Sequence, residues 1–348
     1  MSKLRVGLLF GGRSEEHEVS IMSARSVFTA ADPEKYEIIP VAISKEGYWL
    51  DSGQSREILL DETVTAVQKG KEGSIPTSVI PFLKERLDLV FPVLHGPYGE
   101  DGKIQGLFEI LDIPYVGAGV MSSAIGMDKA IMKELFSYWG LPQAKYKVFY
   151  ASKMTGDLTA LKREIESGIG WPCFIKPANL GSSIGINKVH YPGELEQAIK
   201  EGFKHDRKII IEEFIKGREI ECSVLGNEKP VVSLPGEIRP KHEFYDYEAK
   251  YIDESTELVI PAPLDDELVE EVKELAVSAF RAIDARGFAR VDFFLRDLDN
   301  KLILNEINTI PGFTRYSMYP KLWEVSGISY RELIDRLIDL ALEWQSEQ

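Results

Sequence analysis

The sequence predicts an α/β fold divided into two or three domains, the first of which contains a mostly parallel sheet. Strand-like and helix-like patterns alternate through the first third of the chain, which favours parallel strands with helices on both faces. The 348 residues are too many for a single hydrophobic core. An apolar fraction of 44% and a charged fraction of 28% are typical of a soluble globular protein with ordinary cores.

The first third of the chain contains four apolar runs that are expected to form strands. They cover residues 4–10, 36–43, 87–94 and 113–117. The next segment, 120–138, has the pattern of one helix that leads into a second unit. Domain boundaries are expected near 120–128 and near 215–220, which gives domains 1–125, 126–217 and 218–348.

The rest of the chain mixes further strands and helices. The expected strands cover 172–177, 208–215, 219–226 and 229–238, and the expected helices cover 193–203, 265–284 and 329–344. Between them lies a loop over 239–256 that is rich in aromatic and charged residues. Long loops in compact domains are usually lids or disordered, and the aromatic content favours an ordered lid.

Charge and composition exclude several classes of function. The net charge of −15 argues against nucleic acid or an anionic membrane surface as the main partner. The only cysteines, Cys173 and Cys222, lie in apolar runs, so a reducing cytoplasm is the simplest location. The first apolar run ends at Phe10 and is therefore a strand, not a signal peptide. No run approaches the roughly 20 apolar residues of a membrane helix.

Two runs near the carboxyl end, 290–295 and 301–312, predict a β-hairpin joined by the turn Asp297-Leu298-Asp299-Asn300. If the turn is centred near Asp299, each residue before the turn lies opposite the residue that is equally far beyond it. Side chains alternate between the two faces of a strand, so every second residue shares a face.

This register predicts a polar patch in apolar surroundings. Asp292 lies opposite Glu306 and Arg290 opposite Asn308, all four on one face. Buried carboxylates without partners are very costly, and a hard cation such as Mg2+ takes oxygen ligands. The sequence therefore predicts a magnesium site. The alternative is a solvated acidic hairpin at a sheet edge, against which the apolar flanking residues argue.

Two glycine-containing motifs follow strands in the first third of the chain. GGRSEEHEVS (11–20) lacks the G-x-G-x-x-G of a dinucleotide site, and Ser14 is expected to cap the following helix. A carboxylate there could hold a substrate amine, or the acidic residues could simply complement the helix dipole. HGPYGEDGKIQG (95–106) is no P-loop, because Pro97 and Ile104 replace required residues. His95 could contact a substrate carboxylate or be structural.

The middle of the chain offers groups that could bind a nucleotide. KPANLGSSIG (176–185) places Lys176 before a loop whose N–H groups and hydroxyls could close over phosphates. Lys129 could supply a second charge. EEF (212–214), with Glu219 and Glu221 nearby, offers acceptors for an adenine amine and ribose hydroxyls. Exposed loop lysines and solvated strand-end charges are the alternatives.

Taken in this order, the motifs resemble those of the ATP-grasp ligases, and more narrowly those of the D-alanine–D-alanine ligase family. The resemblance runs from GGRSEEHEVS through MDK (127–129), KPANLGSSIG and FYDYEAKY (244–251) to NEINTIPG (305–312). It implies a three-domain ATP-grasp architecture, in which an N-terminal parallel-sheet domain is joined to two α+β domains that sandwich ATP.

The resemblance also implies roles for individual residues. Lys129 and Lys176 would contact the ATP phosphates, Glu212 the adenine amine and Glu219 the ribose, with Glu213 and Ile215 in the same site. Two Mg2+ ions, or Mn2+, would be ligated by Asp292, Glu306 and Asn308. Glu16 would hold the amine of the first D-alanine, with His95 near its carboxylate, and Ser182 and Tyr251 would be hydrogen-bonded to Glu16. Lys250 and Ser317 would hold the second D-alanine, and Arg290 and the Gly312 N–H would face the oxyanion.

The implied activity is ATP-dependent joining of two D-alanines through an acyl phosphate, for synthesis of cell-wall peptidoglycan precursors. The lid sequence FYDYEAKY, with Tyr251, matches the peptide-forming members of the family. A ligase that uses D-lactate is the alternative. A nucleotide-binding regulator or a nicotinamide dehydrogenase is a less favoured reading. Relatives are commonly dimers, so a homodimer is expected.

Overall fold

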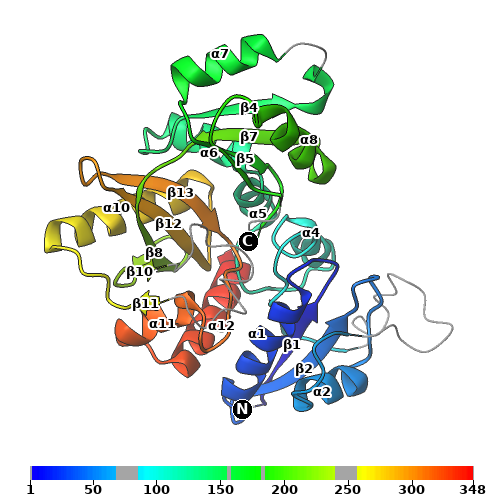
Figure 1. Ribbon diagram of the computed structural model, residues 1–348. Helices are drawn as coiled ribbons and strands as arrows, with labels where there is room; N and C mark the ends of the chain where they lie inside the picture. Colours follow the sequence, from blue (N-terminus) through cyan, green and yellow to red (C-terminus); the bar gives the residue numbers. More distant parts are fainter. Residues whose placement is uncertain (1, 68–84, 155–157, 182–184, 240–256, 348) are drawn as a thin grey trace.

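The computed structural model describes residues 2–67, 85–154, 158–181, 185–239 and 257–347. Nearly all of the expected lid, 239–256, lies outside the described residues. Three sheets follow one another along the chain, and Figure 1 shows them as three units that meet in the middle of the molecule. The expected α/β fold, with a parallel sheet in the N-terminal part and further sheets in the rest of the chain, is confirmed. The domain bounds themselves stay a prediction.

The first sheet is parallel and has the order β2-β1-β3. Its strands are β1 (Leu4–Gly11), β2 (Tyr36–Ile43) and β3 (Leu89–Pro92). Helices α1 (His17–Ala30) and α2 (Ser52–Leu60) pack against it, as does α4 (Lys103–Ile110). The strand expected over 113–117 is wrong, because only the single bridge between Val90 and Tyr115 forms there.

The second sheet is antiparallel, with the order β4-β7-β5-β6. Its strands are β4 (Tyr146–Tyr150), β5 (Cys173–Pro177), β6 (Asn187–Val189) and β7 (Lys208–Glu213). A short 3-10 helix, η1 (Ala151–Lys153), follows β4. Helices α7 (Thr159–Gly168) and α8 (Leu195–His205) bury their apolar sides on this sheet, in a core that contains Ile165, Ile199 and Ile211.

The third sheet is antiparallel and has the path β11-β10-β8-β12-β13, with β9 also paired to β8. The strands are β8 (Gly217–Leu225), β9 (Val231–Val232), β10 (Gly236–Arg239), β11 (Glu257–Val259), β12 (Phe288–Arg296) and β13 (Leu302–Asn308). Helix α10 (Asp266–Ala282) packs on it. The strand expected over 229–238 is wrong as one element, since it divides into β9 and β10.

The β12–β13 hairpin has the predicted register at its functional end. Arg290 pairs with Asn308, and Asp292 pairs with Glu306. Beyond Asp292 the register shifts by one residue, so that Phe293 lies opposite Leu304. This irregularity leaves Asn305 as an extra residue, as in a β-bulge, and separates the polar end from the apolar end.

The single helix expected over 120–138 is wrong. The chain forms α5 (Val120–Met127) and α6 (Lys129–Tyr138), which are separated by Asp128. Asp128 has extended backbone angles, and its carboxylate accepts hydrogen bonds from the N–H groups of Ala130 and Ile131. An aspartate in this position is a preferred N-cap. The break makes Lys129 the first residue of α6.

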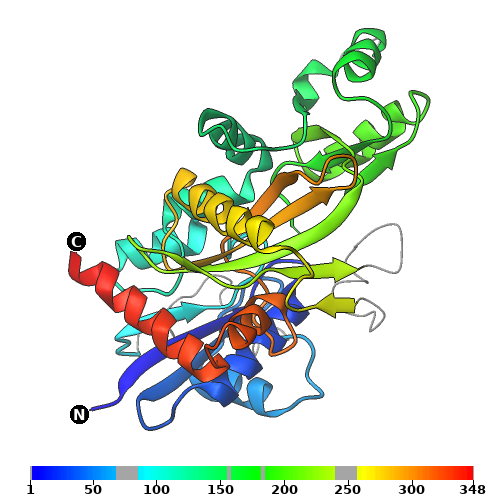
Figure 2. The same cartoon turned by 90° about the vertical axis from the view of Figure 1, so that its left-hand side faces the viewer.

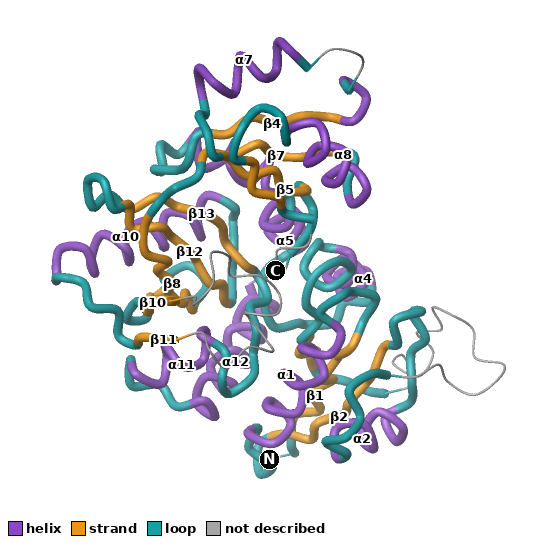
Figure 3. The backbone as a smooth tube through the Cα atoms, in the orientation of Figure 1, coloured by secondary structure: helices purple, strands orange, loops and turns teal. Residues whose placement is uncertain are grey.

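The carboxyl-terminal helices return to the first sheet. Helix α11 (Met318–Val325) is followed by α12 (Tyr330–Glu347), whose buried face includes Leu333 and Leu337. These side chains share one core with Val6, Leu8 and Phe91 of the N-terminal sheet. Figures 2 and 3 show α12 beside the elements of that sheet, although it is the last element of the chain. No helix within the described residues is long and apolar enough to span a lipid bilayer.

Candidate active site

Two cavities meet where the three sheets approach one another. The first cavity, of about 670 Å³, is lined by Glu16, His95, Arg290, Asn308, Gly312 and Ser317, among others. The second, of about 780 Å³, is lined by Lys176, Glu212, Glu213, Ile215 and Glu219, among others. They are called the substrate cavity and the nucleotide cavity after the roles expected for these residues. Lys129, Gly181 and Glu306 line both cavities. Groups held in the two cavities can therefore meet at these three residues.

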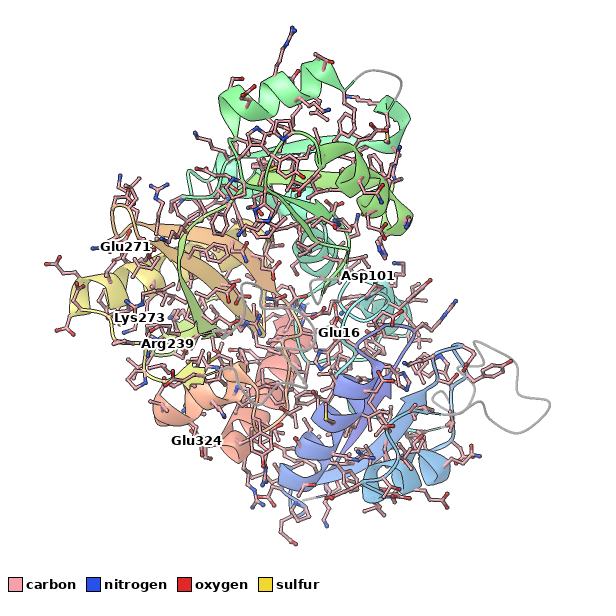
Figure 4. The ribbon with its side chains drawn as sticks, in the orientation of Figure 1. Glu16, Asp101, Arg239, Glu271, Lys273 and Glu324 are labelled. Atoms are coloured by element: carbon pink, nitrogen blue, oxygen red, sulfur yellow. The ribbon has the colours of Figure 1, made fainter. Side chains whose placement is uncertain are left out.

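Glu16 lies at the start of α1, where β1 ends. The expected cap at Ser14 is wrong, because α1 begins at His17 with Glu16 as its N-cap residue. Glu16 makes no side-chain capping bond, while its N–H donates to the Ser14 hydroxyl at 3.3 Å. Its carboxylate lies in the wall of the substrate cavity, and Figure 4 shows Glu16 in the middle of the molecule.

Two glycines let other loops approach the Glu16 carboxylate. A Cβ atom on Gly96 would lie 2.8 Å from Glu16 Oε2, and one on Gly181 would lie 3.3 Å from it. Gly96 follows β3, whereas Gly181 belongs to the loop after β5. The structure thus brings residues of the first motif, the histidine motif and the glycine- and serine-rich loop to one carboxylate.

His95 is buried, and both of its ring nitrogens have partners within the protein. Nδ1 lies 2.9 Å from the Ile310 carbonyl, and Nε2 lies 3.0 Å from the Ser23 hydroxyl. A carbonyl only accepts, so Nδ1 carries the proton and Nε2 accepts from Ser23. Burial lowers the pKa of His95, in agreement with a neutral ring. Its contact with a substrate carboxylate stays a prediction.

The loop that carries Gly312 is held from both sides. The His95 ring binds the Ile310 carbonyl, the Phe313 N–H donates to the Ser23 hydroxyl at 3.2 Å, and the Tyr330 hydroxyl donates to the Phe313 carbonyl at 2.6 Å. These partners come from the histidine loop, α1 and α12. The Gly312 N–H is therefore carried by a fixed segment, as an oxyanion donor requires.

A second acid, Glu100, lies in the substrate cavity with Glu16. Its carboxylate accepts a hydrogen bond of 2.9 Å from the Gly96 N–H. Burial, together with the nearby charge of Glu16, raises the pKa of Glu100 well above its usual value. The sequence does not single out Glu100, because an acidic residue in a turn shows no distinguishing pattern until the fold places it beside Glu16.

Arg290 and the predicted metal residues form one patch on β12 and β13. Arg290 donates two hydrogen bonds of 2.7 Å to Asp292, and the Asn308 amide donates one of 3.0 Å to the same carboxylate. Glu306 lies 3.3 Å from the Lys129 amine. All four predicted residues are thus together, with Arg290, Glu306 and Asn308 in the cavity wall. The alternative of a solvated edge hairpin is wrong, since Asp292 is only 7% exposed.

Glu221 belongs to this patch and not to the nucleotide cavity. It lies opposite Asp292 on β8, is 4% exposed, and approaches the Arg290 Nε to 3.1 Å. Its expected place among the acceptors for adenine or ribose is wrong, because it lines the substrate cavity. Glu219 and Glu221 share a face of β8 but lie two residues apart along the strand, so that Glu219 lines one cavity and Glu221 the other.

The patch fits a hard divalent cation by its chemistry. Asp292, Glu306 and Asn308 offer two carboxylates and an amide oxygen in register on adjacent strands. Among the described residues, no group of three or more His, Cys, Asp or Glu side chains is placed to hold a metal by itself. Magnesium commonly takes one or two protein carboxylates and completes its shell with water and phosphate oxygens, so this donor set suits it when a nucleotide is present.

Lys129 and Lys176 reach the cavities from different elements. The Lys129 amine donates to the Leu180 carbonyl at 2.8 Å, which ties α6 to the loop after β5. The Lys176 amine lies 2.5 Å from Glu212 Oε2. Burial opposes charge on both partners, but their attraction prevails, so the pKa of Lys176 is raised.

Glu212 is bound by a second lysine that the sequence analysis did not find. Lys133 Nζ lies 2.5 Å from Glu212 Oε1, and the two side chains are 2% and 3% exposed. Burial disfavours the Glu212 anion, yet Lys133 and Lys176 together lower its pKa to about 2. Lys133 lies on the buried face of α6, and a lysine at a core position was the signal that could have revealed it.

Three more of the residues predicted to bind a nucleotide lie in or beside the wall of the nucleotide cavity. Glu213 and Glu219 line the cavity with Ile215, which is buried. Phe174 and Phe294 supply apolar surface to the same cavity. Three other predicted residues, Ser182, Lys250 and Tyr251, lie outside the described residues. Ser317 is described: its hydroxyl accepts from the Thr314 N–H at 3.1 Å, in the substrate cavity.

Comparisons with known proteins agree with this geometry. The family described as D-ala D-ala ligase N-terminus matches residues 5–118, and the one described as D-ala D-ala ligase C-terminus matches residues 135–339. A protein named D-alanine–D-alanine ligase from Halothermothrix orenii is 60% identical over 343 residues, which are 99% of each chain. The chain belongs to the D-alanine–D-alanine ligase family. The family resemblance found in the sequence is confirmed.

Similar solved structures support the same fold. The D-alanine–D-alanine ligase from Coxiella burnetii matches with a TM-score of 0.84 and 36% identity, over 100% of this chain and 96% of that chain. The VanG D-Ala:D-Ser ligase from Enterococcus faecalis matches with a TM-score of 0.81 and 36% identity, over 98% and 100%. The architecture is the ATP-grasp fold expected from the sequence.

Proposed function

We propose that the chain joins two D-alanine molecules into D-alanyl-D-alanine, using ATP and an acyl-phosphate intermediate, for peptidoglycan precursor synthesis. One observation carries the proposal: the substrate cavity and the nucleotide cavity share Lys129, Gly181 and Glu306. A carboxylate held beside Glu16 and a terminal phosphate held by the lysines would therefore meet. Family membership supports the same reaction, and the D-lactate alternative is not favoured.

The first substrate would be oriented by its charge. The Glu16 carboxylate would pair with the substrate ammonium, which directs the substrate carboxylate toward Lys129 and the shared wall. Lys129 and Lys176 would bind the phosphates of ATP, with Glu212, Glu213, Ile215 and Glu219 around adenine and ribose. Attack of the substrate carboxylate on the γ-phosphorus depends mainly on such positioning and charge neutralisation.

Asp292, Glu306 and Asn308 would hold two Mg2+ ions, for which Mn2+ could substitute. When bound, these ions would neutralise charge on the triphosphate. Before that, Arg290 and Lys129 balance the carboxylates, because Arg290 binds Asp292 and Lys129 lies 3.3 Å from Glu306. The two cations thus offset part of the negative charge of the patch in advance, with one carboxylate in excess once Glu221 is counted, and this lowers the cost of burying carboxylates.

The second step would use the fixed donors on the other side of the cavity. The amine of the second D-alanine attacks the acyl carbon, the C–O bond to phosphate breaks, and inorganic phosphate leaves. Arg290 and the Gly312 N–H would stabilise the oxyanion that forms between these events. Ser317, Lys250, Ser182 and Tyr251 would complete the site around the acceptor.

Two further properties concern the assembly of the protein and its location. A homodimer is expected from the family. The described Cys173 and Cys222 are unpaired, buried thiols, which supports a reducing compartment such as the cytoplasm.

Product identification tests the function directly. The protein would be incubated with Mg-ATP and a mixture of D-alanine, L-alanine, D-serine and D-lactate, and the products separated by mass. We expect D-alanyl-D-alanine, one phosphate released per dipeptide, and no product after magnesium is chelated. Equal use of L-alanine would contradict the proposal, and a dominant ester or D-serine product would overturn the assigned acceptor.

A further inference from the structure

A buried triad of charges lies in the wall of the nucleotide cavity. Lys133 and Lys176 each approach one oxygen of Glu212 to 2.5 Å. The Lys133 side chain is 2% exposed, whereas the Lys176 side chain is 13% exposed. Among the described residues, Lys176 and Glu212 line the cavity and Lys133 does not. Lys133 therefore lies behind the cavity wall. Burial lowers the pKa of Lys133, and the adjacent Glu212 carboxylate opposes this shift and favours the ammonium form.

The triad contains two positive charges and one negative charge. If Lys176 were the only partner of Glu212, the pair would be neutral and would offer little net attraction to an anion. Within the triad, the second ammonium leaves a surplus of one positive charge, on which Glu306 and Glu219 also act. That surplus faces the cavity at Lys176, because Lys133 is enclosed between Glu212 and the Tyr146 ring, whose centroid is 5.7 Å from Nζ. Low-dielectric surroundings strengthen its effect on a nearby anion.

We propose that Lys133 is a positioning residue for the nucleotide phosphates: it neutralises Glu212 from behind, so that the charge of Lys176 remains available to the phosphates. This inference rests on the proposed function, because it concerns the same nucleotide. The competing explanation is an ion pair that only holds α6 against β7. The two explanations make different predictions. A loss of charge weakens binding more for a ligand with more phosphates, whereas a loss of packing weakens binding equally for all of them.

The substitution Lys133→Met removes the charge and keeps an unbranched side chain of similar length. Calorimetry would measure the Kd of Mg-ADP and of adenosine. We expect Mg-ADP to bind about tenfold more weakly, because a unit charge near the phosphates is lost, and adenosine to bind within about twofold of the wild-type value.

A double variant makes the charge argument specific. Lys133→Met combined with Glu212→Gln again leaves one surplus positive charge, on Lys176. The ratio of adenosine Kd to Mg-ADP Kd should therefore return most of the way to its wild-type value, even if loss of Glu212 weakens adenosine binding. A packing role predicts no such recovery, because the second substitution removes a further contact.

Lys147→Met is the matched control. Lys147 lies on β4 beside Ile211 of β7, so it is near the triad, but its amine pairs with Glu164 on α7 and its side chain is 40% exposed. This variant loses the same charge and should keep the wild-type Kd ratio. If Lys133→Met leaves the ratio of adenosine Kd to Mg-ADP Kd unchanged, because both ligands bind as before or both bind equally more weakly, the inference about Lys133 is overturned and the proposed function is not. Failure of the wild-type chain to bind Mg-ADP would overturn the proposed function with it.

Discussion

Arg290 and Asp292, two residues apart on one face of β12, are joined by two hydrogen bonds of 2.7 Å. The same guanidinium approaches Glu221 on β8 to 3.1 Å. Arg290 is thus held by two carboxylates from neighbouring strands. If a metal takes the oxygens of Asp292, Glu221 still holds the guanidinium, which faces the oxyanion in the proposed mechanism.

Replacing Arg290 should cripple chemistry and spare nucleotide binding. We expect Arg290→Ala to lower kcat by about 10²–10³-fold, the cost of losing one oxyanion donor, with little change in the Kd of Mg-ADP. The control is Arg296→Ala, on the same strand, where the arginine makes two 2.8 Å hydrogen bonds to Asp299 at the surface. A wild-type rate for Arg290→Ala would exclude the oxyanion role.

Removing one charge from the metal patch should abolish most turnover while the fold persists. Glu306→Gln and Asp292→Asn each keep the size of the side chain but lose a hard anionic ligand. We expect phosphate release to fall by orders of magnitude in both, and its magnesium dependence to shift to higher concentration. Asp297→Asn, in the exposed turn of the same hairpin, should behave as wild type. Unchanged turnover in both patch variants would remove the metal assignment.

The carboxyl-terminal helix should contribute to stability through the N-terminal sheet. Leu337 on α12 is 1% exposed in a core shared with Leu8 and Phe91. Leu337→Ala should lower the free energy of unfolding by about 2–5 kcal/mol, as is usual for buried leucines. Leu298→Ala, at a position that is 87% exposed, should change it by less than about 0.5 kcal/mol. Denaturant unfolding would measure both, and equal effects would contradict the packing.

Stability should depend on pH through Glu212. Its pKa is lowered to about 2, because Lys133 and Lys176 outweigh the effect of burial. A lowered folded-state pKa stabilises the fold above the unfolded value of about 4.3, and this contribution is lost as pH falls toward 2. It is worth about 3 kcal/mol at neutral pH. The stability gap between wild type and Glu212→Gln should therefore narrow between pH 4.5 and 2; a gap that stays constant would contradict the ion pairs.

Much of the candidate site could be predicted because its residues lie in short, ordered motifs on regular elements. The alternation of side chains along β12 and β13 was sufficient to place Asp292 opposite Glu306 and Arg290 opposite Asn308. A strand has only two faces, so a hairpin register follows from its turn. Family resemblance then supplied what residue spacing cannot indicate, such as the roles of individual residues and the D-configuration of the substrate.

Helix boundaries and a short strand were predicted less well, for local reasons. Asp128 ends one helix and caps the next, so an apolar pattern that continues across it looks like one helix. The run 113–117 forms only a bridge at Tyr115, although its composition suits a strand. Apolar residues in a short segment can be buried without pairing, and composition does not distinguish the two cases.

The sequence by itself determined the family, the hairpin register and the order of the motifs, because these depend on neighbouring residues and on the backbone period. Only the tertiary structure decided that Glu100 faces the same cavity as Glu16, that Glu221 holds Arg290, and that Lys133 lies behind Glu212. It also decided that α12 completes the core of the first sheet. These contacts join segments far apart in the chain, and burial and charge pairing in the folded chain select them.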